Sequence, residues 1–115
     1  MASDRMRRVN EAVRQVLTDA VAQDLQDPRI GFVTMTSVKT TSDLRHARVY
    51  VSVLGSDEQR VATLAGLASA HGALQRRLAR ELRLKRTPTL EFFYDDTTDR
   101  AMHLEELLRR EARET

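Results

Sequence analysis

Residues 69–86, SAHGALQRRLARELRLKR, place a glycine inside a pattern that is otherwise helical. After this glycine, apolar residues recur at the spacing of one helix face, at Leu74, Leu78 and Leu82. Glycine costs about 1 kcal/mol relative to alanine in a helix interior, and it frees the backbone to bend. We therefore predict two helical segments that meet at a kink made by Ala70, His71 and Gly72.

The end of the same segment is rich in positive charge. Residues 76–86 contain one acidic residue, Glu81, and six basic residues: Arg76, Arg77, Arg80, Arg83, Lys85 and Arg86. Arg76, Arg80 and Arg83 share one helical stripe opposite the leucines, so the kink would turn them outward. Cations that neutralise phosphates release condensed counterions, and the resulting net charge of +5 favours a polyanionic partner. The alternative is a solvated face in which Arg77 and Glu81 form an i, i+4 ion pair.

Upstream, apolar residues between Val9 and Leu25 follow one stripe and predict a first amphipathic helix. Pro28 and Gly31 end it, because the residue before proline is pushed out of the helical region and glycine tolerates a tight turn. The start of this helix carries four arginines, Arg5, Arg7, Arg8 and Arg14. Cations near a helix N-terminus oppose the helix dipole, so we interpret them as candidate contacts to an external partner.

Two runs rich in β-branched residues follow, FVTMTSVKTT at 32–41 and RHARVYVSVL at 45–54. In the second run, Ala47 and three valines alternate with other residues at the period of a strand with one buried face. The short link between the runs predicts a β-hairpin. Arg45 and Arg48 on this hairpin either extend the cationic surface or pair with acidic neighbours.

The rest of the chain continues the alternation of helices and strands. Ser56 and Gln59 fit a capping box that opens the helix before the kink. Pro88 bars further helix, TLEFFYDD at 89–96 predicts a third strand, and residues 97–114 predict a final helix. The order α-β-β-α-kink-α-β-α indicates an α+β domain of two layers, a three-stranded sheet with helices packed on one face.

Length and composition fit a single domain that spans residues 1–115. Hydrophobic residues make up 41% and charged residues 31%, which argues against a disordered chain or a fibre. The chain has no cysteine, so disulfides, cysteine metal sites and thiol nucleophiles are excluded. No stretch approaches the roughly 20 apolar residues of a membrane span, so we expect a soluble cytoplasmic protein that binds no membrane.

Catalytic and metal-binding patterns are weak in this sequence. Asp95, Asp96 and Asp99 cluster before the final helix, where capping and dipole preferences already favour acidic residues. The three histidines lack metal-ligand spacing, and no serine lies in a nucleophile or phosphate-loop motif. We therefore predict no enzyme, no metal site and no cofactor. Core or sheet packing, and not a base-stacking platform, is the expected use of the strand aromatics Tyr50, Phe92, Phe93 and Tyr94.

This order of elements, together with several motifs, resembles the bacterial ribosome-binding factor A family. The motifs are DPRIG at 27–31, DLRHARVYVSVL at 43–54, AHG at 70–72 and LRLKRTPTLEFFYDD at 82–96. The resemblance implies a fold like the type II KH domain. It also implies a role in late maturation of the small (30S) ribosomal subunit and in 16S rRNA processing, close to the decoding centre, and a link to growth in the cold.

The resemblance also bears on the predicted kink. An ordinary KH domain has a G-x-x-G loop between two helices, through which the nucleic-acid backbone approaches closely. The family has an A-x-G interruption instead, matched here by Ala70, His71 and Gly72. We accordingly predict that RNA contacts His71, the six cations of residues 76–86, the four N-terminal arginines, Arg45 and Arg48.

The expected partners are the small ribosomal subunit and precursor 16S rRNA, bound by a monomer through phosphate contacts and without catalysis. Two other interpretations remain open. One is a protein–protein interaction module, and the other is a small DNA-binding domain with a basic helix in the major groove.

Overall fold

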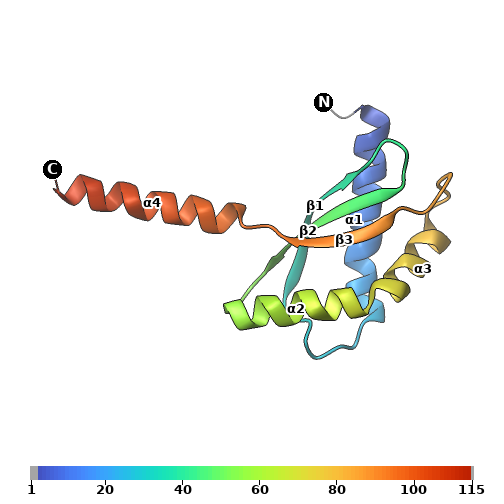
Figure 1. Ribbon diagram of the computed structural model, residues 1–115, viewed down its shortest axis with the longest axis horizontal. Coiled ribbons are helices and arrows are strands. Elements are labelled where there is room, and N and C mark those ends of the chain that lie inside the picture. The colour runs from blue at the N-terminus through green and yellow to red at the C-terminus, as the bar shows by residue number, and fades with distance from the viewer. Residues whose placement is uncertain (1–2, 115) are drawn as a thin grey trace.

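The structure, a computed structural model, describes residues 3–114. Its elements follow in the predicted order (Figure 1): α1 Asp4–Asp24, β1 Val33–Thr40, β2 His46–Val53, α2 Asp57–Ser69, α3 His71–Glu81, β3 Thr89–Tyr94 and α4 Thr97–Glu114. The hairpin, the interrupted helix pair, the third strand and the final helix are therefore confirmed.

The predicted capping box starts α2. Ser56 Oγ accepts a hydrogen bond from the Gln59 N–H at 3.2 Å, and Gln59 Oε1 accepts one from the Ser56 N–H at 2.6 Å. Gly55 precedes the box with a φ of 139°, a conformation that side chains rarely adopt. A Cβ at this position would lie 2.0 Å from Gln59 Oε1, so the box requires glycine here.

The three strands form one mixed sheet in the order β1-β2-β3. β1 pairs with β2 in antiparallel orientation, with a bulge between Met35 and Ser37, and β2 pairs with β3 in parallel. Along β2, Ala47 and the three valines are buried while the intervening residues are exposed or half-buried. The sheet therefore has one core face and one open face.

The core lies between the sheet and helices α1, α2 and α3. Its helical residues are Val13, Val16, Leu17, Ala20, Leu67, Leu74 and Leu78, all buried against the valines of the sheet. Burying one such side chain is worth about 1.5–3 kcal/mol, so these three helices are held chiefly by apolar packing.

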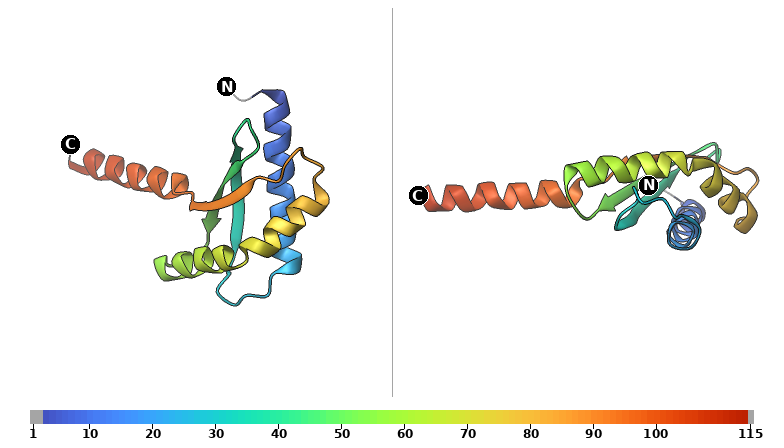
Figure 2. Two further views of the ribbon diagram at one scale, coloured as in Figure 1. Left: turned by 45° about the vertical axis from the view of Figure 1, so that its right-hand side comes forward. Right: turned by 90° about the horizontal axis from the view of Figure 1, so that it is seen from below.

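Helix α4 stands apart from this core. It has no buried residue, and it projects away from the rest of the chain (Figures 1 and 2). The radius of gyration is 16.7 Å, against about 13 Å for a compact chain of this length. The predicted packing of helices on one face of the sheet thus applies to α1, α2 and α3.

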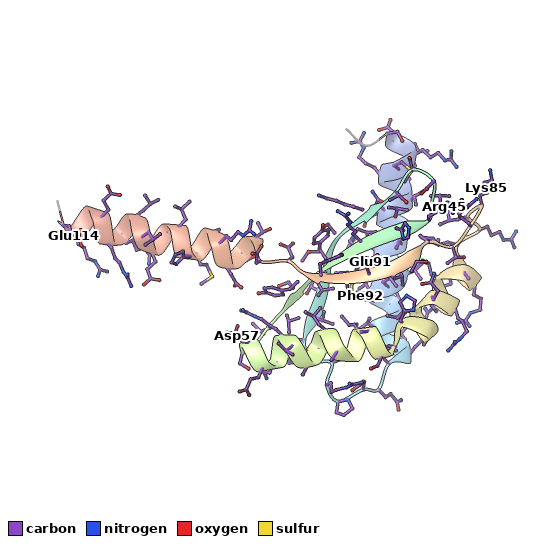
Figure 3. The ribbon with its side chains drawn as sticks, viewed as in Figure 1. Arg45, Asp57, Lys85, Glu91, Phe92 and Glu114 are labelled. Atoms are coloured by element: carbon purple, nitrogen blue, oxygen red, sulfur yellow. The ribbon has the colours of Figure 1, made fainter. Side chains whose placement is uncertain are left out.

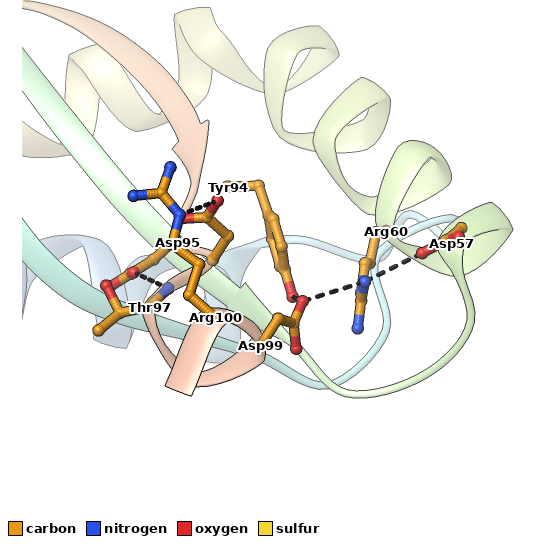
Figure 4. A network of polar contacts seen from close by, with 8 residues as sticks. Asp57, Arg60, Tyr94, Asp95, Thr97, Asp99 and Arg100 are labelled. Carbon is orange, nitrogen blue, oxygen red and sulfur yellow. Dashed lines mark hydrogen bonds and ion pairs between the residues drawn. The ribbon is translucent and has the colours of Figure 1, made fainter. Parts of the chain in front are cut away.

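A polar network fixes the direction in which α4 leaves β3 (Figure 4). Tyr94 Oη donates to Asp99 Oδ2 at 2.6 Å, and Arg60 Nη1 of α2 lies 3.2 Å from the same oxygen. Arg60 also pairs with Asp57 at 2.9 Å, and its guanidinium carbon lies 4.9 Å from the centre of the Tyr94 ring. The first turn of α4 is therefore tied to both α2 and β3.

The other two acidic residues before α4 also have partners. Asp95 accepts hydrogen bonds from the Thr97 N–H at 3.0 Å and from Thr36 Oγ1 at 2.7 Å, and Asp96 pairs with Arg100 at 2.8 Å. The hydrogen bonds from Thr97 and then Thr36 lower the pKa of Asp95 to about 2. These carboxylates serve the β3–α4 junction.

Between residues 3 and 114, no helix is both long enough and apolar enough to cross a membrane.

Candidate nucleic-acid interface

The helical run breaks at Ala70, which ends α2 and precedes α3. This residue has φ −84° and ψ 3°. Its N–H donates to the Gly66 carbonyl at 3.0 Å, and its carbonyl accepts from the Leu74 N–H at 3.0 Å. The chain therefore changes direction over one residue while hydrogen bonds of helical spacing continue on both sides.

The break lies at Ala70, the first residue of the predicted trio Ala70, His71 and Gly72, and not at the glycine. Gly72 lies in the first turn of α3, and it is not among the described glycines with positive φ. A Cβ added there would meet Arg76 Nη1 at 3.3 Å, which is the movable end of a long side chain. The bend therefore does not depend on glycine at this position, and of the predicted trio only Ala70 carries it.

Two apolar residues and one amide anchor α3. Leu74 and Leu78 are buried and Leu82 is partly buried, as the leucine spacing predicted. Gln75 Nε2 donates to the Pro88 carbonyl, and Gln75 Oε1 accepts from the Leu90 N–H at 3.3 Å. Gln75 thus fixes the far end of the cationic loop after α3, a role that helical spacing did not reveal.

Arg77 differs from the other five cations because the protein's own carboxylates neutralise it. Its guanidinium donates to Asp24 of α1 at 2.7 Å and also pairs with Glu81. These two hydrogen bonds raise the pKa of Arg77, and its side chain is only 12% exposed. Arg77 is therefore engaged within the protein, and its contact with RNA stays a prediction without support from this geometry, while the i, i+4 pair with Glu81 is confirmed.

The remaining cations form what we call the α3 cationic surface: Arg76, Arg80, Arg83, Lys85 and Arg86. All five are exposed, and none forms an ion pair with another residue of the described range 3–114. Arg76 and Arg80 lie on α3, but the helix ends at Glu81, so Arg83 lies beyond it. The prediction of one helical stripe that includes Arg83 is therefore wrong.

The hairpin turn lies beside the loop of this surface. The Thr89 N–H donates to the Arg45 carbonyl at 2.8 Å, and Arg45 and Lys85 lie at the same end of the sheet (Figure 3). Arg45 has a carboxylate neighbour, Asp43, at 3.5 Å. Arg48 is exposed and has no ion pair within the described part of the chain.

The start of α1 reaches the same hairpin. Asn10 Oδ1 accepts a hydrogen bond from the Thr40 N–H at 2.9 Å. Of the four arginines in this region, Arg7 pairs with Asp4, and Arg14 donates to Glu11 at 2.9 Å, while Arg5 and Arg8 are exposed and have no ion pair between residues 3 and 114. The bond from Arg14 lowers the pKa of Glu11. Contact between these four arginines and RNA stays a prediction, as does contact between half-buried His71 and RNA.

Two residues of α2 that sequence reasoning missed hold the DPRIG loop. Buried Thr63 Oγ1 accepts from the Gly31 N–H at 3.3 Å and lies 3.3 Å from the Arg29 carbonyl, to which it donates. A Cβ on Gly66 would lie 2.7 Å from Ile30 Cγ1, so the loop packs directly on the α2 backbone. The sequence did contain a signal for this close packing, because Gly66, like Gly72, is a glycine inside a helical pattern.

Known proteins are similar to this chain in sequence and in fold. A family model described as Ribosome-binding factor A matches residues 5–108. A ribosome-binding factor A of Geobacter sulfurreducens is 42% identical over 106 residues, which cover 92% of this chain and 90% of the relative. The crystal structure of ribosome-binding factor A from Thermus thermophilus has a TM-score of 0.69 and 29% identity, covering 77% of this chain and 93% of that chain. Coordinates of the Thermus thermophilus factor fitted into a cryo-electron microscopy map of a 30S complex have a TM-score of 0.62 and 30% identity, covering 75% of this chain and 90% of that chain.

Proposed function

This chain belongs to the ribosome-binding factor A family, and from that premise we propose that it binds the small ribosomal subunit and acts in its late maturation and in 16S rRNA processing. The predicted family resemblance is thus confirmed. The three-stranded α+β architecture is likewise consistent with the KH-like fold expected for this family.

The observation that carries the proposal is the α3 cationic surface. Five exposed cations gather on one helix face and the loop after it, and within residues 3–114 no carboxylate forms an ion pair with them. Exposed cations that no carboxylate neutralises favour the phosphate backbone of a nucleic acid. A related factor fitted into the map of a 30S complex supports ribosomal RNA as that nucleic acid.

The proposed mechanism is binding without chemistry. A protein that binds one conformation of a maturing subunit more tightly than another shifts the population toward the first. The chain would do so in the cytoplasm as one KH-like domain and as a monomer, without a cofactor. Phosphate contacts would supply most of the affinity and little base recognition.

A salt titration of binding to purified 30S subunits tests the proposal. We expect log Kd to rise steeply with log salt, because each neutralised phosphate contributes about 0.7–0.9 to the slope. Replacing Arg76, Arg80 and Arg83 by glutamine is expected to reduce this slope by about 2–3. The matched control replaces Arg109, Arg110 and Arg113 of α4, with the same change in net charge, and is expected to leave the slope unchanged.

Three results would contradict this function. A slope near zero for the unmodified protein would indicate a protein-binding module. Equal losses in the α3 and α4 variants would indicate unspecific charge attraction. Competition by duplex DNA as effective as that by structured RNA would favour the DNA-binding alternative.

A further inference from the structure

Two aromatic rings lie on the open face of the sheet. Tyr50 of β2 is directly opposite Phe93 of β3 in the parallel register, and both alternate with the core-facing residues of their strands. Their ring centroids are 5.7 Å apart with an angle of 30° between the planes. The neighbouring Phe92 packs against the core, as expected for a strand aromatic, but Phe93 faces away from it.

The described helices leave this pair uncovered. Helices α1, α2 and α3 contribute to the core on the other face, and α4 projects away from the sheet (Figure 1). Phe93 is 39% exposed, although aromatic rings are usually withdrawn from water. A flat apolar surface is therefore available to a partner.

Cations flank the rings on the same face. Lys39 of β1 has its Nζ 5.7 Å from the centre of the Tyr50 ring, and Arg48 precedes Tyr50 by two residues on β2. Lys39 and Arg48 are register partners, both are exposed, and neither forms an ion pair within residues 3–114. Two carboxylates lie near the rings: Glu91 is the register partner of Arg48, and Asp95 accepts from Thr36 Oγ1, which also donates to the Tyr50 carbonyl.

This combination fits an unpaired nucleotide better than a peptide. Every base has a flat π-face that stacks on an aromatic ring, and its phosphates bind neighbouring lysine and arginine side chains. The site lies on the same sheet as the hairpin end that contacts the cationic loop. Arg45, beside the cationic loop, lies five residues before Tyr50 on the same chain, which is about 17 Å of extended strand.

We propose that Phe93, supported by Tyr50, is a stacking site for an unpaired RNA base, and that Lys39 and Arg48 bind its flanking phosphates. This inference rests on the proposed rRNA-binding function and adds a second contact on the opposite face of the sheet from the helices. It differs from the expectation that the strand aromatics serve core or sheet packing.

The chain contains no tryptophan, so Phe93→Trp introduces a single indole reporter at the site. Stacking of a base on that indole is expected to quench its emission when a short single-stranded oligoadenylate RNA is added. The matched control is Phe32→Trp, at a residue 81% exposed that precedes β1, and we expect no quenching there. Absence of quenching at position 93, or equal quenching at both positions, overturns the proposal.

Affinity separates stacking from a structural role. Phe93→Leu keeps apolar bulk but removes the flat ring, and is expected to weaken oligoadenylate binding by about 5- to 150-fold. Phe93→Tyr keeps the ring and is expected to bind normally. If the Phe93→Leu protein melts at a lower temperature but binds RNA normally below that temperature, the Tyr50–Phe93 pair has only a packing role and the stacking proposal is overturned.

The two proposals fail in distinguishable ways. Loss of steep salt-dependent binding to 30S subunits by the unmodified protein overturns the proposed function. Normal salt-dependent binding, combined with no effect of Phe93→Leu and no quenching, overturns the stacking site alone. If the indole emission of the Phe93→Trp protein changes with 30S subunits but not with oligoadenylate, the stacking site is overturned in favour of a ribosomal protein contact.

Discussion

Arg77 of α3 donates a hydrogen bond to Asp24 of α1 at 2.7 Å, across 53 residues of sequence. The same guanidinium also donates to Gln23 at 3.1 Å and pairs with Glu81 on its own helix. One arginine therefore joins the helix that carries the α3 cationic surface to the end of α1. This joint holds α3 while its neighbours Arg76 and Arg80 remain exposed.

We expect Arg77→Gln to lower the melting temperature, because it removes both ion pairs from a largely buried side chain. Asp24→Asn should lower it as well, and the double variant should lose less than the sum of the two. Thermal melts followed by circular dichroism measure these shifts. Arg80→Gln on the exposed face is the control. Equal melting temperatures for Arg77→Gln and Arg80→Gln would contradict a stabilising role of the Arg77 contacts between α1 and α3.

This contact illustrates what the sequence could and could not predict. The i, i+4 spacing of Arg77 and Glu81 predicted their ion pair, and leucine periodicity predicted the buried face of α3. Local spacing holds no information on Asp24, because that contact arises only when α1 and α3 pack together. Spacing alone therefore groups the six cations of the segment together, whereas in the folded protein Arg77 is paired and the other five are exposed.

Backbone details were hidden from the sequence for a similar reason. Residues 42–44 predicted a turn, but not that buried Leu44 adopts a φ of 60°. The left-handed region costs a non-glycine residue about 1–2 kcal/mol, and burial of the leucine in the folded domain offsets it. Likewise, residues 97–114 predicted the final helix, but the sequence could not show that Leu104 and Leu108 stay exposed.

The two helical glycines should respond differently to alanine. A Cβ on Gly66 would lie 2.7 Å from Ile30 Cγ1, so Gly66→Ala should cost about 1–3 kcal/mol of the free energy of unfolding by overpacking. Gly72→Ala should change it by less than about 1 kcal/mol, and in the stabilising direction, because Arg76 can move and alanine favours helix. Urea denaturation measures both.

Truncation of Ile30 provides the internal check on this pair. Ile30→Ala removes the clashing atom, so the double variant with Gly66→Ala should be less destabilised than the sum of the single changes. If Gly72→Ala proved the more damaging substitution, the bend would depend on glycine after all.

The stability of the fold should depend on pH through the ionisation of Asp95. Hydrogen bonds from Thr97 and Thr36 lower the pKa of Asp95 from 3.8 to about 2, so the folded state favours the carboxylate. The stabilisation is fully present above the unfolded pKa, near 3.8, and is lost as the pH falls through about 2. Asp95→Asn should therefore be less stable than the unmodified protein at neutral pH, with a difference that shrinks over this range.

Thermal melts between neutral pH and about pH 2 test this linkage. Thr36→Val, which removes one of the donors, should raise the pKa of Asp95 and reduce the pH-dependent stabilisation. A carbon-detected NMR titration gives the pKa of Asp95 directly. An ordinary value near 3.8 would remove the basis for the prediction.

The direction of α4 should depend on Asp99. Asp99 accepts from Tyr94 Oη at 2.6 Å and pairs with Arg60 at 3.2 Å, and both partners belong to the folded body and not to α4. Asp99→Ala removes both links. Because α4 buries no side chain, no apolar packing remains to fix its angle, and the helix should reorient freely about residues 95–97. Backbone order parameters of α4 measured by NMR should fall from about 0.85 toward 0.6 or below.

Asp96→Ala is the matched control, because Asp96 is also acidic and next to α4 but pairs with Arg100 within the helix. Its removal should leave the order parameters of α4 close to those of the unmodified protein. Small-angle X-ray scattering offers an independent measure, since a freely reorienting α4 would bring the average radius of gyration below the 16.7 Å of the extended arrangement. Equal order in the two variants would mean that the β3–α4 backbone alone sets the angle, and the Tyr94–Asp99–Arg60 network would then have no role in holding α4.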